Sequence, residues 1–485
     1  MENSYAIPTE KILERLRFEN PWWRTGAIAA QFNDMNRRLY FDLFFPMVQD
    51  ITVRRALILM GPRRVGKTVM MHHAIHALLE SGVPASSIAF IGIDNPIYIN
   101  MGLEELFLKT LEASGSGEAE GNYVFFDEIQ YLRDWERHLK VMVDSYPKTK
   151  FIVSGSAAAA LRMKSSESGA GRFHDFMLPP LTFQEFIHLQ DLQYLVQPNE
   201  TTFLGTTVPF YKAIDIKELN QQFFNYLNYG GYPEVLFDER IKDDMPKFIK
   251  NDIIDKVLLR DLPSIYGISD VQELNRFFTY LAFNTGKEFS YQKIAKDSAL
   301  KKEKIREYLQ YLEAVFLISV VNKVDVNARH FKRVTGFKVY LTNPSLRTAL
   351  FSPVSYTDDE AGGIVETAIF SQWMHRENVR LYYARWRLGR KEGEVDMVQL
   401  DDVSQKPSWA VEIKWSNRFA DNPGKLRSLI EFCKQNRIKA AVVTSIDRQT
   451  QLLQDGIELN YHPASLYAYI IGANTLNQSN EKPTF

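Results

Sequence analysis

The residues best suited to chemistry stand in the segment GPRRVGKT at positions 61–68. An apolar run, ALILM (56–60), precedes it, and the stretch VMMHHAIHALLESG (69–82) follows with apolar residues at helical spacing. A phosphate-binding loop requires this order of strand, loop and helix, because the loop must turn tightly and aim backbone N–H groups at phosphate oxygens. Gly61 and Gly66 permit such a turn, since neither carries a side chain. The segment therefore predicts a nucleotide site.

Two side chains at the end of this loop have defined roles in such a site. Lys67 is predicted to reach the β and γ phosphates, and Thr68 to ligate Mg2+. The predicted cofactors are thus ATP and Mg2+. The predicted nucleotide-binding residues are Gly61, Pro62, Arg63, Arg64, Val65, Gly66, Lys67, Thr68 and Val69.

The second half of the site is predicted in YVFFDE (123–128), an apolar strand that ends in two carboxylates. Asp127 is expected to hold the magnesium shell, and Glu128 to polarise the attacking water, which favours hydrolysis over passive binding. A further apolar strand ends in Ser154 and Ser156, where a sensor of the γ-phosphate would sit between the other two strands. Ser156 could equally cap the helix expected to follow it.

An arginine that completes the site from a neighbouring subunit is also expected. Arg172, in GAGRFHDFML, follows a loop of small residues and precedes a strand, so it could reach the neighbour's γ-phosphate. A plain surface role fits it as well, and Arg162, Arg63 and Arg64 compete for the same task. The sequence leaves this choice open.

Length and composition set the frame for these sites. The chain has 485 residues, so two to four domains are expected, and its 45% hydrophobic and 24% charged residues suit a globular protein. Its 58 basic and 59 acidic residues give no overall attraction to nucleic acid. The single cysteine, Cys433, excludes an internal disulfide and is expected in the core of a helix. Without a signal peptide or an apolar run of spanning length, we expect a cytoplasmic protein with no membrane partner.

These motifs, together with FIVSGSAAA, TFQEF, YGGYPEVL and KVYLTNPSLRTAL, occur in an order that resembles one known family. It is the prokaryotic AAA-type ATPases, in which an ATPase domain of the AAA_14 type is followed by a C-terminal domain of unknown function numbered 4143. The resemblance runs from about Asn20 to Leu459. It implies an AAA+ ATPase and a C-terminal domain similar to nucleases. In NPWWR and RRLYF, Trp22, Trp23 or Tyr40 could pack near the adenine, although core packing is the alternative.

The middle of the chain has the rhythm of a helix-turn-helix. A helix over 271–281, a short helical segment from Tyr291, a longer helix over 302–316 and a strand at 318–324 predict a winged helix. Basic residues gather where the longer helix begins, and there a recognition helix would meet DNA: Lys301, Lys302, Lys304 and Arg306. The alternative is a lid or protein interface whose lysines are simply solvated.

The C-terminal part carries a pattern that can be set against a magnesium-dependent nuclease core, which needs two or three carboxylates and a lysine. The residues that fit it are Glu366, Asp396, Glu412 and Lys414. Glu394 could replace Asp396 as a ligand. Such a fold can cleave nucleic acid or hold it without chemistry, and the sequence does not decide between the two.

The predicted fold is α/β: a P-loop AAA+ domain with a parallel sheet, a helical lid, a winged-helix region and a C-terminal α/β domain resembling restriction endonucleases. The expected divisions are 1–50, 51–185, 186–255, 256–330, 331–470 and a flexible tail at 471–485. The expected function is ATP hydrolysis coupled to DNA association. A nucleotide-switched interaction protein and an ATP-gated nuclease are the alternatives, and self-association is left open.

Overall fold

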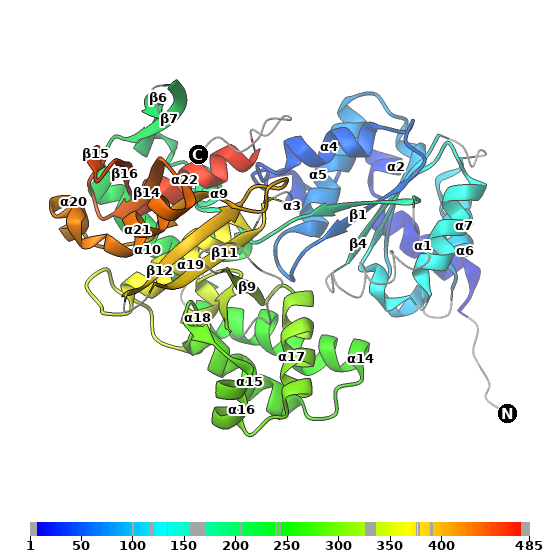
Figure 1. Cartoon of the computed structure of the whole chain (residues 1–485). Coiled ribbons are helices and arrows are strands. Elements are labelled where there is room, and N and C mark those ends of the chain that lie inside the picture. Colours follow the sequence, from blue (N-terminus) through cyan, green and yellow to red (C-terminus); the bar gives the residue numbers. More distant parts are fainter. Residues whose placement is uncertain are drawn as a thin grey trace. The chain divides into compact units, whose positions relative to one another are not determined.

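The computed structural model describes residues 7–98, 101–116, 121–132, 134–155, 171–203, 206–237, 241, 244–324, 336–374, 376, 379–388 and 391–476. The chain divides into two compact units, Met1–Pro179 and Pro180–Phe485 (Figure 1). No helix in the described part of the chain is both long and apolar enough to span a membrane.

The first unit is built on a five-stranded parallel sheet with the order β2-β3-β4-β1-β5. The strands are short apolar runs, as expected where helices cover a parallel sheet. Their bounds are β1 Ala56–Met60, β2 Ile88–Gly92, β3 Tyr123–Asp127, β4 Lys150–Gly155 and β5 Phe173–Met177. Because the strands are parallel, their carboxyl ends share one edge, which is where ligands bind in open sheets of this kind.

The helices of the first unit form two groups (Figure 1). One contains α3 Ala30–Asn33, α4 Phe41–Gln49 and α5 Lys67–Glu80, in which α3 and α4 pack on α5. The other contains α1 Thr9–Glu19, α6 Leu103–Ser114 and α7 Trp135–Ser145, in which α6 contacts both α1 and α7. The residues before 50 are therefore packed onto the same unit as the parallel sheet. The short helix α2 Trp22–Thr25 lies between α1 and α3 in the sequence.

The second unit contains a nine-stranded mixed sheet with the order β15-β16-β14-β13-β12-β11-β9-β10-β8. Its strands are β8 Glu288–Phe289, β9 Ile318–Val324, β10 Phe337–Leu341, β11 Leu381–Leu388, β12 Lys391–Leu400, β13 Pro407–Glu412, β14 Ala440–Ser445, β15 Thr450–Gln454 and β16 Ile457–Pro463. β9 pairs with β10 on one side and, in parallel, with β11 on the other. One continuous sheet thus joins the segment predicted as a winged helix to the predicted C-terminal domain.

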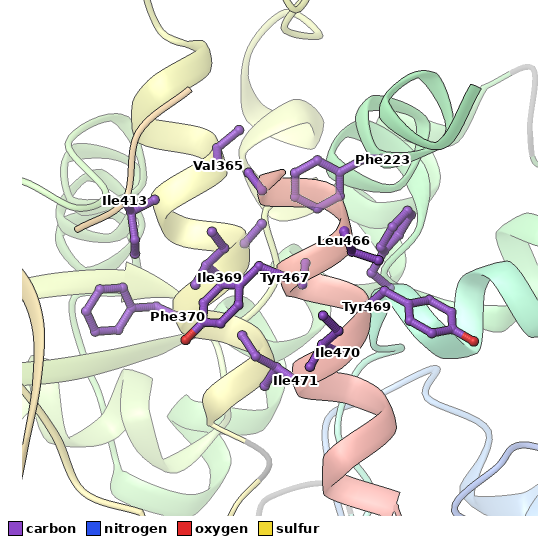
Figure 2. Close-up of a cluster of buried hydrophobic side chains, with 14 of the residues drawn as sticks. Phe223, Val365, Ile369, Phe370, Ile413, Leu466, Tyr467, Tyr469, Ile470 and Ile471 are labelled. Atoms are coloured by element: carbon purple, nitrogen blue, oxygen red, sulfur yellow. The ribbon is translucent and has the colours of Figure 1, made fainter. Parts of the chain in front are cut away.

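Two helices supply much of the core of this unit, α19 Ala361–Trp373 and α22 Ala464–Leu476. Figure 2 shows them facing each other, with Ile369 of α19 near Tyr467 and Ile471 of α22. Phe223, from α10 Ile216–Tyr229, belongs to the same cluster. A second cluster forms under α21 Arg427–Asn436 and contains the buried Cys433, as the sequence predicted.

The remaining helices of this unit precede α19 in the sequence. They are α9 Phe183–Leu189, α11 Pro233–Phe237, α13 Met245–Phe248, two π-helical segments η5 Ile249–Asp255 and η6 Val257–Asp261, α14 Leu262–Tyr266, α15 Val271–Phe283, α16 Tyr291–Ser298, α17 Lys302–Ala314 and α18 Ser345–Leu350. Short turns complete the unit: η4 Gln193–Leu195, α20 Arg418–Asp421 and η7 Pro423–Lys425. The first unit adds η1 Ala85–Ser87, η2 Pro96–Tyr98 and η3 Ile129–Tyr131.

One element differs from the helical lid that was expected over residues 186–255. An antiparallel hairpin, β6 Val196–Phe203 with β7 Thr206–Ala213, interrupts it. Threonine and valine are frequent in both strands, and these β-branched residues favour extended backbone. The aromatic content of the region concealed this local preference.

Candidate functional site

The loop between β1 and α5 is shaped by its glycines. Gly66 has φ +93°, a conformation that residues with a side chain rarely adopt, and α5 begins directly after it at Lys67. At Gly61, a Cβ atom would lie 2.1 Å from the carbonyl oxygen of Leu178. The backbone of Leu178 comes this close because its N–H donates to Met60 O at 2.7 Å. The loop is thus confined between α5 and the continuation of β5.

Lys67 is buried, and its ammonium group turns back onto the loop. Nζ donates to the carbonyl oxygens of Gly61 at 3.0 Å and Pro62 at 2.8 Å. A phosphate oxygen that entered the loop would find the ammonium already held there. The geometry fits the predicted role of Lys67.

Thr68, Asp127 and Ser154 form one hydrogen-bonded network at the carboxyl edge of the sheet. Thr68 Oγ1 donates to Asp127 Oδ2 at 2.7 Å, and Ser154 Oγ donates to Asp127 Oδ1. Ser154 Oγ also accepts from the backbone N–H of Glu128 at 3.0 Å. Because β4 lies between β1 and β3, Ser154 reaches both halves of the site. The structure therefore brings together the residues predicted from three separate segments.

Asp127 is the most electrostatically perturbed residue of this network. The pKa of Asp127 rises from 3.8 to about 6, mainly through burial and also through the nearby charge of Glu128, while hydrogen bonds from Ser154 and Thr68 oppose the change. A buried carboxylate supported by neutral hydroxyl groups suits an arriving cation. Mg2+ in nucleotide sites takes one or two protein oxygens and several from phosphates, and Thr68 with Asp127 fits this requirement. These two residues would hold the ion.

Glu128 has φ +56°, a left-handed conformation that is uncommon for a residue with a side chain. Gln130 Nε2 donates to Glu128 Oε2, so the carboxylate predicted as general base is held by an amide two residues away. The sequence reading did not include Gln130. Its place two residues after Glu128 was the available signal.

Arg38 is a second residue that sequence reasoning missed. It is buried, and its Nη1 donates to Val65 O at 2.9 Å and to Pro179 O at 2.8 Å. The guanidinium thus links the N-terminal segment to the phosphate loop and to the end of the first unit. An arginine pair before LYF gave no clue to these partners, which lie 27 and 141 residues away.

The other loop residues point in different directions. Val65 is buried, Arg64 is exposed with φ +65°, and Val69 is partly buried in α5. Arg63 Nη2 lies 3.5 Å from the hydroxyl of Tyr131. These positions do not distinguish the two arginines as partners of a phosphate.

Arg172 lies away from the phosphate loop of its own chain. The carbonyl oxygen of Arg172 accepts a hydrogen bond from the backbone N–H of Ala56, the first residue of β1. The phosphate loop follows Met60, the last residue of β1. Roughly 16 Å of strand therefore separates Arg172 from the loop. Arg172 Nε pairs with Asp144 Oδ1 at 2.5 Å. A role toward a neighbouring subunit stays a prediction. Ser156 and Arg162 lie outside the described residues.

Of the aromatic residues near the N-terminus, Trp22 and Tyr40 are buried and Trp23 is partly buried. The indole nitrogens of Trp22 and Trp23 both donate to Ile88 O, at 2.9 and 2.8 Å, at the amino end of β2. That edge of the sheet is opposite the phosphate loop. Tyr40 meets Phe176 edge to face. The two tryptophans therefore fit the core-packing alternative.

The four nuclease-like residues also come together, on the sheet and helix α19 of the second unit. Lys414 Nζ lies 3.0 Å from Asp396 Oδ2 and 2.8 Å from Glu412 Oε1. The backbone N–H of Ile413 donates to the same Asp396 oxygen at 2.9 Å. Glu366 of α19 is close enough for its charge to act on Glu412. We call the carboxyl groups of Glu366, Glu394, Asp396 and Glu412, with their lysines, the carboxylate centre.

A second lysine, absent from the predicted set, belongs to this centre. Lys338 Nζ of β10 lies 3.0 Å from Glu366 Oε1 and 2.8 Å from Glu394 Oε1. Tyr340 donates its hydroxyl proton to Glu366 Oε1 at 2.6 Å. Glu394, weighed in place of Asp396, is thus part of the centre together with Asp396. Nothing in the segment KVYLTNPS (338–345) distinguishes Lys338 from an ordinary strand residue.

Burial dominates the electrostatics of the carboxylate centre. It raises the pKa of Glu412 to about 7, helped by the charge of Asp396 and opposed by Lys414. Burial alone would lower the pKa of Lys338, but the charges of Glu366, Asp396 and Glu394 hold it above its ordinary value. Among the described residues, no group of three or more His, Cys, Asp and Glu side chains could hold a metal ion.

The basic residues of the predicted recognition helix lie at the beginning of α17. Lys301, Lys302 and Arg306 are exposed. Arg306 lies over the ring of Tyr291 at 5.1 Å, and Lys304 pairs with Glu307 at 3.1 Å. The cluster is therefore a surface feature in which Arg306 also contacts the neighbouring helix α16 and Lys304 pairs within α17.

Comparison with known families gives a match to the region that contains the parallel sheet. Residues 53–187 match the AAA_14 family model, described as an AAA domain. The chain thus carries an AAA-type ATPase-like domain, and this part of the predicted resemblance is confirmed. The second match is to a domain of unknown function, DUF8612, over residues 220–356. It differs from the expected domain 4143, which these matches do not show.

Known proteins similar to this chain add little about its activity. An uncharacterized protein of Haemophilus influenzae is 21% identical over 83% of this chain and 92% of its own. One from Methanocaldococcus jannaschii is 24% identical over 74% of this chain and 76% of its own. The solved structure of the ORC2 protein of Aeropyrum pernix, in ADPNP and ADP complexes, is 11% identical with a TM-score of 0.38. That similarity covers 68% of this chain and 92% of the other.

Proposed function

We propose that the protein binds and hydrolyses ATP and couples this reaction to association with DNA. The observation that carries the ATPase part is the network in which Asp127 accepts from Thr68 of the phosphate loop and from Ser154 of β4. It joins the loop that would hold the phosphates to the strand end that carries Glu128. The AAA domain match over residues 53–187 supports the same conclusion.

Each residue of the site has a task in this proposal. Lys67 and the backbone N–H groups of the loop bind the β and γ phosphates. Mg2+, when bound with ATP, neutralises charge that develops on the phosphate oxygens. Thr68 and Asp127 hold that ion, and Glu128 orients the attacking water and accepts its proton. Ser154 fixes the backbone of Glu128, so the carboxylate starts from a defined position.

The DNA part of the proposal rests on the order of elements in the second unit. Helix α15, strand β8, helices α16 and α17, and strands β9 and β10 follow one another, and β10 pairs antiparallel with both β8 and β9. A winged helix has this order of helices and strands, and its last helix enters the major groove with its N-terminal residues. Lys301 and Lys302 are exposed at that end of α17.

We assign the carboxylate centre to a nuclease-like module that holds nucleic acid without cleaving it. Its residues come from the elements expected of the fold, Glu366 from a helix and Asp396 and Glu412 from adjacent strands. Arg172 is proposed to act toward a second copy of the chain, because it lies at the far end of β5 from its own phosphate loop.

The ATPase proposal is tested with two variants and one control. We expect Lys67→Ala to abolish binding of a fluorescent ATP analogue, because the ammonium that meets the phosphates is gone. Glu128→Gln should bind the analogue normally but release no phosphate. Lys140→Ala, an exposed residue of the same unit, should behave as the parent protein. Unchanged phosphate release in both site variants would contradict the proposal.

The DNA proposal is tested by measuring phosphate release and DNA binding together, beside a sizing measurement. We expect DNA to stimulate turnover, and binding to weaken steeply as salt rises, because phosphate contacts release counterions. Replacing both Lys301 and Lys302 by Gln should make the slope of log binding constant against log salt concentration shallower by roughly one to two. The same change at Lys247 and Lys250 is the control. Absence of DNA binding at low ionic strength would favour the nucleotide-switched interaction protein instead.

A further inference from the structure

The carboxylate centre contains a buried lysine for which the proposed ATPase has no use. Lys338 is 4% exposed at its side chain, although it carries a charge. Its ammonium bridges Glu366 Oε1 at 3.0 Å and Glu394 Oε1 at 2.8 Å, and it lies 5.4 Å from the ring centre of Tyr383. A lysine is rarely buried to this extent unless its charge is paired.

Lys414 repeats the arrangement on the other half of the centre. It bridges Asp396 at 3.0 Å and Glu412 at 2.8 Å. Each of the two ammonium groups therefore joins two carboxylates that come from different elements. A divalent cation in an oxygen-ligand site also lies between carboxylates. Each lysine ammonium thus places a positive charge where such a cation would place one.

The positive charge that these carboxylates already bind argues against a metal ion in this arrangement. Mg2+ needs several oxygen ligands in near-octahedral geometry. Glu366 and Glu394 instead share the ammonium of Lys338 at 2.8–3.0 Å, the ordinary range of a charge-assisted hydrogen bond, so a divalent ion between them would have to displace a buried positive charge. Glu366 is held further by the Tyr340 hydroxyl on the same oxygen. The residues present thus do not fit the divalent cation that a nuclease-like fold implies.

We propose that Lys338 is the built-in cation of the carboxylate centre, placed between Glu366 and Glu394 where a divalent ion would otherwise bind. The centre consequently carries two cations of the chain itself, Lys338 and Lys414, between its four carboxyl groups, and it takes up neither Mg2+ nor Mn2+. This inference is independent of ATP hydrolysis, because it concerns residues of the second unit and is read from metal binding.

Metal binding to the full-length protein tests the proposal. Mn2+ would be titrated without nucleotide and followed by the loss of the free-ion signal in electron paramagnetic resonance. All proteins would carry Asp127→Asn, so that the ATP site does not contribute. We expect the parent to bind Mn2+ no more tightly than about 1 mM. Lys338→Met should bind at least about tenfold more tightly, because one positive charge beside the ion is removed.

Two further variants distinguish a gained site from a general charge effect. Lys323→Met removes a lysine that pairs with Glu288, outside the centre, and should leave Mn2+ binding unchanged. Adding Glu366→Gln to Lys338→Met should lose the gained affinity. Equal affinity of Lys338→Met and the parent would overturn the proposal.

The parent protein alone provides a test that does not depend on the folding of Lys338→Met. Micromolar binding of Mn2+ by the parent, lost in Glu366→Gln, would show that a divalent ion displaces Lys338 and would overturn the proposal. Absence of such binding supports it. Circular dichroism and thermal unfolding establish which variants are folded before they are titrated. Phosphate release, measured without the Asp127 change, reports separately on the ATPase.

Discussion

Replacing Asp127 by Asn should stabilise the nucleotide-free protein while it abolishes ATP turnover. Asp127 is buried, and its pKa rises from the ordinary 3.8 to about 6, mainly through burial. At about 1.36 kcal/mol per unit, ionised Asp127 costs the folded state roughly 3 kcal/mol relative to the unfolded chain. Asn can still bond both neighbouring hydroxyl groups, because they can donate or accept a proton.

The pH dependence of this effect follows from the direction of the shift. In the folded state the Asp127 carboxyl group keeps its proton up to about pH 6, whereas in the unfolded chain it loses the proton near pH 3.8. The free energy of unfolding of the parent protein therefore falls as pH rises from 3.8 to about 6. Asn has no such proton. The advantage of the variant should be full at pH 8, about half at pH 5, and lost below the unfolded value.

Thermal unfolding at pH 5 and pH 8 measures the effect. The transition that MgATP shifts in the parent protein reports on the first unit. For a unit of this size, about 3 kcal/mol corresponds to roughly 6–12 °C. Asp94→Asn, an exposed residue after β2, is the matched control and should shift nothing. A destabilised Asp127→Asn at pH 8, or a difference that does not depend on pH, would refute the reasoning.

Three further predictions concern other residues of the two units. Arg38→Met should raise KM for ATP by about tenfold, since the charged bond that positions Val65 is lost, and Arg38→Lys should recover part of it; an unchanged KM would contradict this role. Gly61→Ala should lower the free energy of unfolding by about 1–3 kcal/mol and weaken nucleotide binding, because its Cβ would meet the Leu178 carbonyl at 2.1 Å; wild-type melting would contradict it. Burial raises the pKa of Cys433 to about 12, so iodoacetamide at pH 8 should modify the protein only after unfolding, as mass spectrometry would show, whereas labelling of the folded protein would speak against this packing.

The local part of the ATP site could be predicted because its residues are neighbours in sequence. A single short segment contains an apolar run, a loop with two glycines and Lys67. In β3, four apolar residues directly precede Asp127, and this pattern predicts a strand that ends in the carboxylate. Ser154 could be placed because parallel strands end at one edge. Arg38 could not, since its partners are backbone carbonyls far along the chain, and any residue offers a carbonyl.

In the second unit, too, the sequence predicts some residues of the site and misses a residue whose partners are distant in the chain. Asp396, Glu412 and Lys414 were predicted together because a known pattern contains them, and they are indeed in contact. Lys338 lies on a strand that the order of the sheet separates from β12, and its role depends on how the sheet brings it to Glu394. A pattern of residue types can list the acids of such a centre, but it cannot reveal which cation already balances them.

The two acidic sites of the chain differ in the source of their positive charge. In the first unit, the hydrogen bonds that Asp127 accepts come from the neutral hydroxyls of Thr68 and Ser154. Under the proposed function, a nucleotide that arrives with Mg2+ would supply positive charge beside Asp127, and cation binding would be part of the response to ATP. In the second unit, the ammonium groups of Lys338 and Lys414 already lie between the carboxylates. Chemistry that depends on a divalent ion is therefore expected in the first unit, whereas the carboxylate centre is built to keep its structure without one.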